Sequence, residues 1–181
     1  MNERRKGLVL LGVQLILVLS VVGKYAYERK TSPRVWTRAA QFDPELPMRG
    51  RYLALQLTVD GCGLAEAAAV DGILRGSYVE GTKWSEWPAS IRAKDGRLIA
   101  HYVDYFEANG TEVRKTEKMP CDRAILSPSV DYFIPEMAKT PFPLEKGQEL
   151  WVEVTVPPTG PPRPIRLALS KGATFDVLKL R

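Results

Sequence analysis

Serine and lysine side chains that could act together in hydrolysis occur in the sequence, but not in a recognisable arrangement. A serine–lysine dyad needs a serine close to a buried lysine of lowered pKa. Ser170 and Lys171 are adjacent, and neighbours in a strand point to opposite faces of a sheet. The other serines considered have no nucleophile motif around them: Ser32, Ser127 and Ser129. These residues therefore do not predict a serine hydrolase.

The acid and base residues give no stronger signal. His101 is the single histidine and falls inside a predicted strand, where a lone histidine is usually a packing or surface residue. Asp104, Asp131 and Glu136 could supply a pair of carboxylates, but nothing in the sequence fixes their separation. We expect no catalytic residues and a non-enzymatic protein, with an unrecognised hydrolase as the least favoured alternative.

Cofactor, metal and nucleic-acid sites are not indicated either. The glycines Gly72, Gly76 and Gly81 are spaced like turns rather than like a phosphate-binding loop. One histidine and two distant cysteines do not make a zinc site. The net charge is +5, but basic and acidic residues are interspersed rather than gathered in a stripe. We expect no cofactor, no metal and no nucleic-acid partner.

The two cysteines, Cys62 and Cys121, leave two interpretations open. In an oxidising compartment they could pair, and closing a loop of this length could contribute up to about 4 kcal/mol. Alternatively they are two unrelated buried thiols, since free cysteine behaves as a small hydrophobic residue. We favour the disulfide.

An apolar segment near the N-terminus predicts a membrane-spanning helix. Residues 7–23 carry no charge, and Gln14 is their only strongly polar side chain. Seventeen helical residues span about 25 Å, which is near the short end for a bilayer. A cleaved signal peptide has the same plan, but the small residues of a cleavage site are poorly represented before Lys24. We expect a retained anchor.

The flanking segments predict the topology. The six-residue tail contains Arg4, Arg5 and Lys6, but bases also follow the helix at Lys24, Arg29 and Lys30. The shortness of the tail therefore decides for a cytoplasmic N-terminus. We expect a tail at residues 1–6, the transmembrane helix at 7–23, a polar stalk at 24–34 and an extracytoplasmic domain at 35–181. This places the domain on the periplasmic side of a bacterial cytoplasmic membrane.

The domain shows the patterns of β structure. Hydrophobic residues make up 45% and charged residues 26% of the chain, which are globular values. Residues 51–60 alternate with Leu53, Leu55, Leu57 and Val59 on one face, and residues 149–156 alternate similarly. Asp95-Gly96 lies between two apolar runs, which predicts a hairpin.

The remaining patterns complete the expected fold. Residues 163–169 and 174–180 predict two more strands, 64–70 look briefly helical, and the charged run 113–118 predicts an exposed edge strand or loop. We expect a mainly β domain, an antiparallel sandwich or partly open barrel of about seven or eight strands, after one transmembrane helix.

Two short blocks resemble the GDYXXLXY family of uncharacterised bacterial membrane-anchored proteins. In residues 42–57, Gly50, Tyr52 and Leu55 match the motif, with Arg49 in its lead-in. Arg51 stands where the family has Asp, and Leu57 where it has the final Tyr. The second block is similar to a downstream segment of the family and contains Tyr132, Phe133, Pro135 and Glu136.

The resemblance implies a single-pass envelope protein, often encoded near multi-pass membrane proteins, and it brings no catalytic residues. The roles of its motif residues are unknown. From the residues themselves we expect Gly50 at a bulge or corner. We also expect Arg49 and Glu136 either to pair at the rim of the sheet or to be separately solvated.

These observations favour a non-enzymatic accessory or interaction subunit beside a multi-pass membrane partner. The alternative is a ligand- or glycan-binding module built on exposed aromatic residues, namely Trp84, Trp87, Tyr102 and Tyr105. Four aromatics at strand spacing are more often core residues.

Overall fold

The structure, a computed structural model, describes residues 3–43, 52–70, 75–79, 82–135, 138 and 141–179. The chain divides into two compact units, Met1–Ser32 and Pro33–Arg181. The first unit is the helix α1 (Glu3–Thr31), which continues through most of the segment expected as a polar stalk. By length and composition α1 could cross a membrane, although an N-terminal signal sequence has the same features.

The second unit is mainly β, which confirms the expected fold class. Two short helical elements accompany its strands, α2 (Leu64–Val70) and the 3-10 turn η1 (Cys121–Arg123). The eleven strands of the described residues are β1 (Arg34–Asp43), β2 (Tyr52–Val59), β3 (Arg75–Val79), β4 (Thr82–Lys94), β5 (Arg97–Tyr102), β6 (Glu112–Thr116), β7 (Ala124–Ser127), β8 (Val130–Phe133), β9 (Gln148–Thr155), β10 (Arg163–Lys171) and β11 (Thr174–Val177). Strands of four or five residues, such as β7 and β8, are too short to show an alternating pattern, which explains why fewer were expected.

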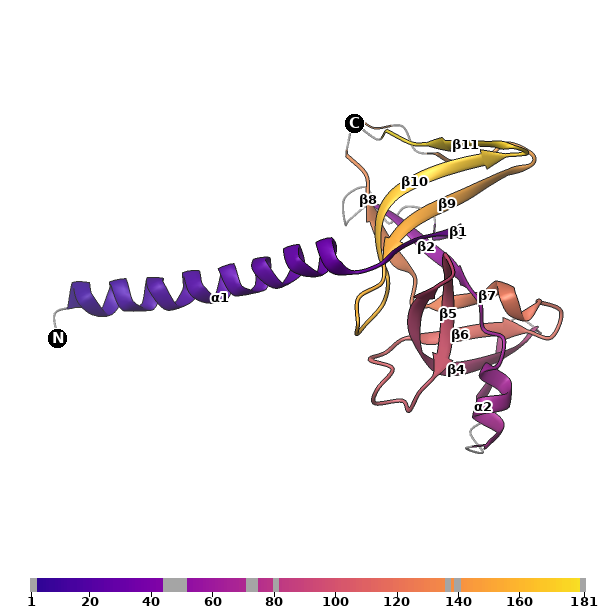
Figure 1. Cartoon of the computed structure of the whole chain (residues 1–181), viewed down its shortest axis with the longest axis horizontal. Coiled ribbons are helices and arrows are strands. Elements are labelled where there is room, and N and C mark those ends of the chain that lie inside the picture. The colour runs from indigo at the N-terminus through magenta and orange to yellow at the C-terminus, as the bar shows by residue number, and fades with distance from the viewer. Residues whose placement is uncertain are drawn as a thin grey trace. The chain divides into compact units, whose positions relative to one another are not determined.

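All pairings between these strands are antiparallel. The main order is β11-β10-β9-β1-β2-β7-β6-β4-β3, with β5 on β4 and β8 on β2 (Figure 1). β2 lies in the middle of this order and joins its two halves. It pairs with β1 on one side and with β8 and then β7 on the other.

One end of the sheet curls back on itself. β2, β7, β6, β4 and β5 follow one another, and the residue after β2 returns to β5. The Asp60 amide donates to the Leu98 carbonyl at 2.8 Å, and the Asp60 carbonyl accepts from the Ala100 amide at 2.8 Å. This end is therefore a small barrel, and β9, β10 and β11 extend from it as an open sheet. The arrangement agrees with the expected partly open barrel.

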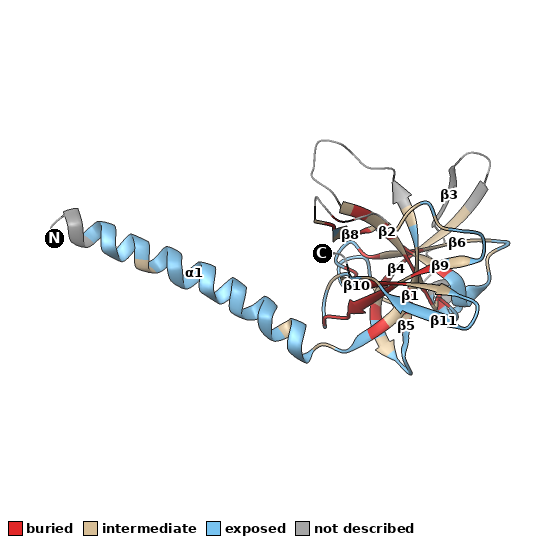
Figure 2. Ribbon diagram, turned by 90° about the horizontal axis from the view of Figure 1, so that it is seen from above, coloured by how far each residue is buried: buried red, intermediate tan, exposed pale blue. Residues whose placement is uncertain are grey.

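The alternating pattern of β2 is confirmed. Leu53, Leu55, Leu57 and Val59 are all buried, as is the apolar face of β9 at Leu150, Val152 and Val154 (Figure 2). These residues belong to one hydrophobic core that spans both ends of the domain. Burying each such side chain contributes about 1.5–3 kcal/mol.

The hairpin predicted at Asp95-Gly96 is confirmed. It joins β4 to β5, with Lys94 opposite Arg97. Asp95 and Gly96 have φ values of 51° and 72°, and both residue types tolerate this left-handed conformation in two-residue hairpin turns. The brief helix predicted at 64–70 is also confirmed as α2.

The prediction of an exposed edge strand or loop at 113–118 is wrong. Most of the charged run forms β6, which lies between β4 and β7 and is hydrogen-bonded on both sides. Val113 is fully buried, and the Arg114 side chain pairs with Glu86 on the neighbouring strand. The loop-like composition comes from Arg114 and Lys115 within the strand and from Glu117 and Lys118 in the turn that follows it.

Candidate functional site

The two blocks that carry the family resemblance lie side by side in the fold. Tyr52 is opposite Phe133 and Leu53 is opposite Tyr132 in the ladder between β2 and β8. Leu55 is fully buried, whereas Phe133 is 69% exposed. Burial raises the pKa of the Tyr132 phenol above its ordinary value of 10.0. The two blocks, whose paired residues Tyr52 and Phe133 are 81 positions apart in the sequence, thus form one structural unit.

The rest of the motif is only partly described. Pro135 follows the buried Ile134 just after β8. Arg49, Gly50, Arg51 and Glu136 lie outside the described residues. The expected corner at Gly50 and the expected pairing of Arg49 with Glu136 therefore stay predictions.

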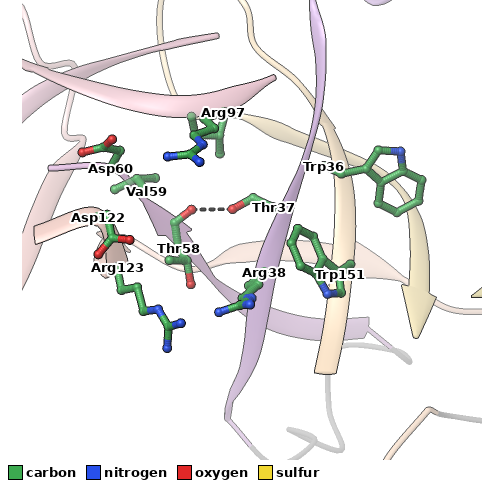
Figure 3. A pocket seen from close by; sticks show the side chains of 11 residues that line it. Trp36, Thr37, Arg38, Thr58, Val59, Asp60, Arg97, Asp122, Arg123 and Trp151 are labelled. Atoms are coloured by element: carbon green, nitrogen blue, oxygen red, sulfur yellow. Dashed lines mark hydrogen bonds between the residues drawn. The ribbon is translucent and has the colours of Figure 1, made fainter. Parts of the chain in front are cut away.

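A pocket of about 250 Å³ opens where β1 and β2 separate (Figure 3). The ladder between these strands ends at Ala39 and Leu57, and the earlier part of β1 pairs only with β9. The Thr37 hydroxyl bridges the separation by donating to the Thr58 carbonyl. Thr37 and the buried side chains of Val59 and Leu98 form the inner part of the lining.

Three arginines from three different elements line this pocket. Arg38 comes from β1, Arg97 from β5 and Arg123 from η1. The guanidinium of Arg38 is held in place, because its Nε lies 3.1 Å from Glu149 Oε2 and its carbon lies 5.4 Å from the centre of the Trp151 ring. Arg97 and Arg123 are exposed and form no ion pair within the described part of the chain.

The carboxylates of Asp60 and Asp122 also line the pocket. Figure 3 shows them on the opposite side from Trp151. The Oδ1 atom of Asp60 accepts a hydrogen bond from the Cys62 amide at 3.0 Å. Three positive and two negative side chains therefore surround the opening. The pocket lining therefore carries both signs of charge, and Figure 3 shows Arg97 near Asp60 and Arg123 near Asp122.

A disulfide between Cys62 and Cys121 fixes this acidic side, which confirms the pairing favoured from the sequence. The Gly61 amide also donates to the Cys121 carbonyl at 2.9 Å. Gly61 permits this close approach, since a Cβ there would lie 3.0 Å from Ala124 Cβ. The residues that follow Cys121 in η1 are therefore held next to Asp60.

An aromatic and ionic cluster on β1, β9, β10 and β11 supports the opposite wall. Phe175 packs edge-on against Trp36 and Trp151, with ring centres 5.1 and 6.1 Å apart. The Arg166 Nε lies 2.6 Å from the buried Glu153 carboxylate, and this ion pair raises the pKa of the Arg166 guanidinium. The wall is thus formed by strand residues whose side chains contact one another.

Four of the residues considered for hydrolysis, Ser170, Lys171, His101 and Asp104, form no common site within the described part of the chain. Ser170 accepts a hydrogen bond from Trp151 Nε1 at 3.1 Å, whereas Lys171 pairs with Glu145 at 2.7 Å. His101 is exposed on β5, and Asp104 is exposed beyond the end of that strand. None of these four side chains lines the pocket.

The alternative of an aromatic platform is not supported, and the core positions favoured from the sequence are found for Trp87 and Tyr102. Trp84 and Trp87 are three residues apart on β4, so they point to opposite faces. Trp87 is only 6% exposed and belongs to the core, and Tyr102 packs against the same core. Of the four aromatics, Tyr105 is mostly exposed, at 58%.

Comparisons with family models, curated proteins and solved structures gave no match to this chain. The pocket was not predicted, because its arginines are isolated in the sequence and reach one pocket only through strand pairing and the disulfide. The single advance signal was the pair of cysteines, which tied the segment near Asp60 to the segment near Arg123.

Proposed function

We propose that this protein is a single-pass envelope protein and a non-enzymatic accessory subunit of a multi-pass membrane protein. In this proposal α1 stays in a bacterial cytoplasmic membrane, with the β domain on the periplasmic side. Membership of the GDYXXLXY family is part of the same proposal. The pairing of its two motif blocks in β2 and β8 supports that membership.

The exposure of α1 carries the proposal. Its large apolar side chains are between about half and two-thirds exposed along the whole segment from Leu8 to Val22. Leaving so much apolar surface in water is strongly unfavourable, so lipid or another protein must cover it. A signal peptide would be removed, and the proposal requires that α1 is retained.

Gln14 supports a partner inside the membrane. It lies near the middle of residues 7–23, is exposed, and has no side-chain hydrogen bond to any described residue. An amide among lipid chains has lost its water, and a hydrogen bond to a neighbouring helix restores about 0.6–2 kcal/mol. A transmembrane helix of a second protein would provide that bond.

The disulfide supports the proposed compartment. Structural disulfides persist in the periplasm and are rare in the cytoplasm. The short basic tail before α1 favours the same topology, because it would remain inside. Both features agree on an exported domain.

Site-specific photocrosslinking within intact membranes tests the proposal. A crosslinker at position 14 should give an adduct with a multi-pass membrane protein, and one at position 16 should give much less. Ile16 is the matched control because it is 68% exposed and lies about 200° around the helix from Gln14. Adducts of this chain with itself, or equal adducts at both positions, would contradict an accessory role beside such a partner.

A second experiment tests retention and topology. A cysteine introduced at Phe106, which is 92% exposed, should react with a membrane-impermeant maleimide applied to the periplasmic side. The mass of the mature chain should still include α1. Labelling only after lysis, or a mature protein that lacks α1, would overturn the proposed topology.

A further inference from the structure

The pocket between β1 and β2 has the chemistry of a small-ligand site, which no part of the accessory role requires. We propose that it binds a small anion that carries hydroxyl groups, with the anionic group held by Arg38, Arg97 and Arg123. A sugar acid or a sugar phosphate has this chemistry. The inference does not depend on the membrane partner.

The arginines provide the anionic subsite. They come from β1, β5 and η1, and Figure 3 shows Arg38 and Arg123 with their guanidinium ends directed toward the same part of the pocket. Guanidinium groups near one another repel, and an anion between them replaces that repulsion with charge-assisted hydrogen bonds. A planar guanidinium also matches the oxygens of carboxylate or phosphate in pairs.

Arg38 is prepared for this role. Glu149 and the face of Trp151 hold its guanidinium from the side of the open sheet. Fixing the side chain in advance reduces the entropy lost when a ligand binds. Arg97 and Arg123 have no competing ion pair among the described residues, so they are available to the ligand.

The two carboxylates in the lining favour a ligand that carries hydroxyl groups over a simple anion. Asp60 and Asp122 accept hydrogen bonds but repel negative charge, and they lie across the pocket from Trp151. A ligand with an anionic group and hydroxyl donors can bind the arginines and the neighbouring carboxylates at once. The volume of about 250 Å³ limits it to less than drug size, which suits a single sugar ring.

Binding measurements on the full chain in a nonionic detergent test this inference. The probes are D-glucuronate, glucose 6-phosphate and inorganic phosphate, with neutral D-glucose as the control ligand, titrated by calorimetry in phosphate-free buffer. We expect saturable binding of at least one sugar anion, weakened by added salt because the charges are near the surface. Glucose should bind at least about tenfold more weakly, since it lacks the charge-assisted bonds.

Arginine variants locate the site. Arg97→Gln or Arg123→Gln should weaken binding about tenfold, because each removes one charge-assisted contact. Arg92→Gln is the matched control, since Arg92 is an exposed arginine of the same β4–β5 hairpin and does not line the pocket. The indole resonance of Trp151, which lies against Arg38, should shift on binding and reports the pocket directly.

The outcomes separate clearly. Binding of glucose 6-phosphate alone assigns the subsite to phosphate, and binding of glucuronate alone assigns it to carboxylate. Inorganic phosphate binding as tightly as any sugar anion overturns the need for hydroxyl groups. No saturable binding of any sugar anion overturns the proposal, as does equal binding of glucose. Binding that survives both pocket variants, or that falls equally with Arg92→Gln, also overturns it.

Discussion

Arg38 and Trp151 are directly opposite each other in the ladder between β1 and β9, and the guanidinium carbon of Arg38 lies 5.4 Å from the centre of the Trp151 ring. Glu149 is two residues from Trp151 on the same face, and its carboxylate lies 3.1 Å from Arg38 Nε. Cross-strand register therefore places the Arg38 guanidinium next to both the Trp151 ring and the Glu149 carboxylate, and Arg38 and Trp151 both line the pocket.

This arrangement predicts a modest contribution to stability. Arg38→Gln should lower the free energy of unfolding of the domain by about 0.5–1 kcal/mol, because a partly exposed cation–π contact and ion pair are lost. Urea denaturation followed by tryptophan fluorescence measures the change. Arg92→Gln, at an exposed position without such contacts, should change stability less; an equal loss in both variants would contradict the role of Trp151 and Glu149.

The ion pair between Arg166 and Glu153 joins an exposed side chain to a buried one, so losing either partner should have a different effect on stability. The Glu153 side chain is only 8% exposed, whereas that of Arg166 is 52% exposed. Arg166→Met leaves the largely buried Glu153 carboxylate without its partner and should lower the free energy of unfolding. The double variant with Glu153→Gln should recover part of the loss, since no buried charge remains. Denaturation of the four proteins in a double-mutant cycle measures the coupling, and additive losses would contradict it.

The disulfide should contribute to the stability of the domain. Replacing Cys62 and Cys121 by serine should lower the free energy of unfolding by about 2–4 kcal/mol, because the unfolded chain loses a 59-residue constraint. Reductant should lower the unfolding temperature of the native protein and leave the double serine variant unchanged. Equal stability with and without the disulfide would show that noncovalent contacts, such as the hydrogen bond from Gly61 to Cys121, already hold these two segments together.

The β core could be predicted from the sequence because its signals are local. Leu55 belongs to an alternating run that requires one buried face, and Asp95-Gly96 requires a tight turn. β6 could not be recognised as an interior strand, because the position of a strand depends on pairing with distant segments. Arg38, Arg97 and Arg123 likewise come to one pocket only through strand pairing between distant segments and the disulfide beside Arg123. The pocket therefore follows from topology rather than from any motif.

The predicted core makes a direct test of the family motif possible. Leu55 is fully buried at the centre of β2, and Leu55→Ala should cost about 2–5 kcal/mol through lost burial and the cavity that remains. Gln56→Ala, at the next and only half-buried position, should cost much less. Chemical denaturation of both variants checks this difference. Similar losses in the two variants would mean that burial of alternate residues in β2 does not determine how much each residue contributes to stability.

The pair of Glu145 and Lys171 connects the start of β9 to the end of β10 and predicts a specific titration. The hydrogen bond and the positive charge of Lys171 lower the pKa of the Glu145 carboxyl below its ordinary value of 4.5. Because the folded-state pKa is lowered, the pair stabilises the protein above the unfolded pKa. That contribution is lost as the pH falls through the folded pKa.

An NMR titration of side-chain carboxyl resonances measures this effect at a single residue. Lys171→Gln should return the Glu145 pKa to its ordinary range, because both causes of the shift are removed. Lys146→Gln is the matched control, since Lys146 is an exposed neighbour that makes no ion pair with a described residue. High salt should weaken the shift in the native protein, as the pair is exposed. A Glu145 pKa that responds equally to both lysine substitutions would indicate a general charge effect rather than this contact.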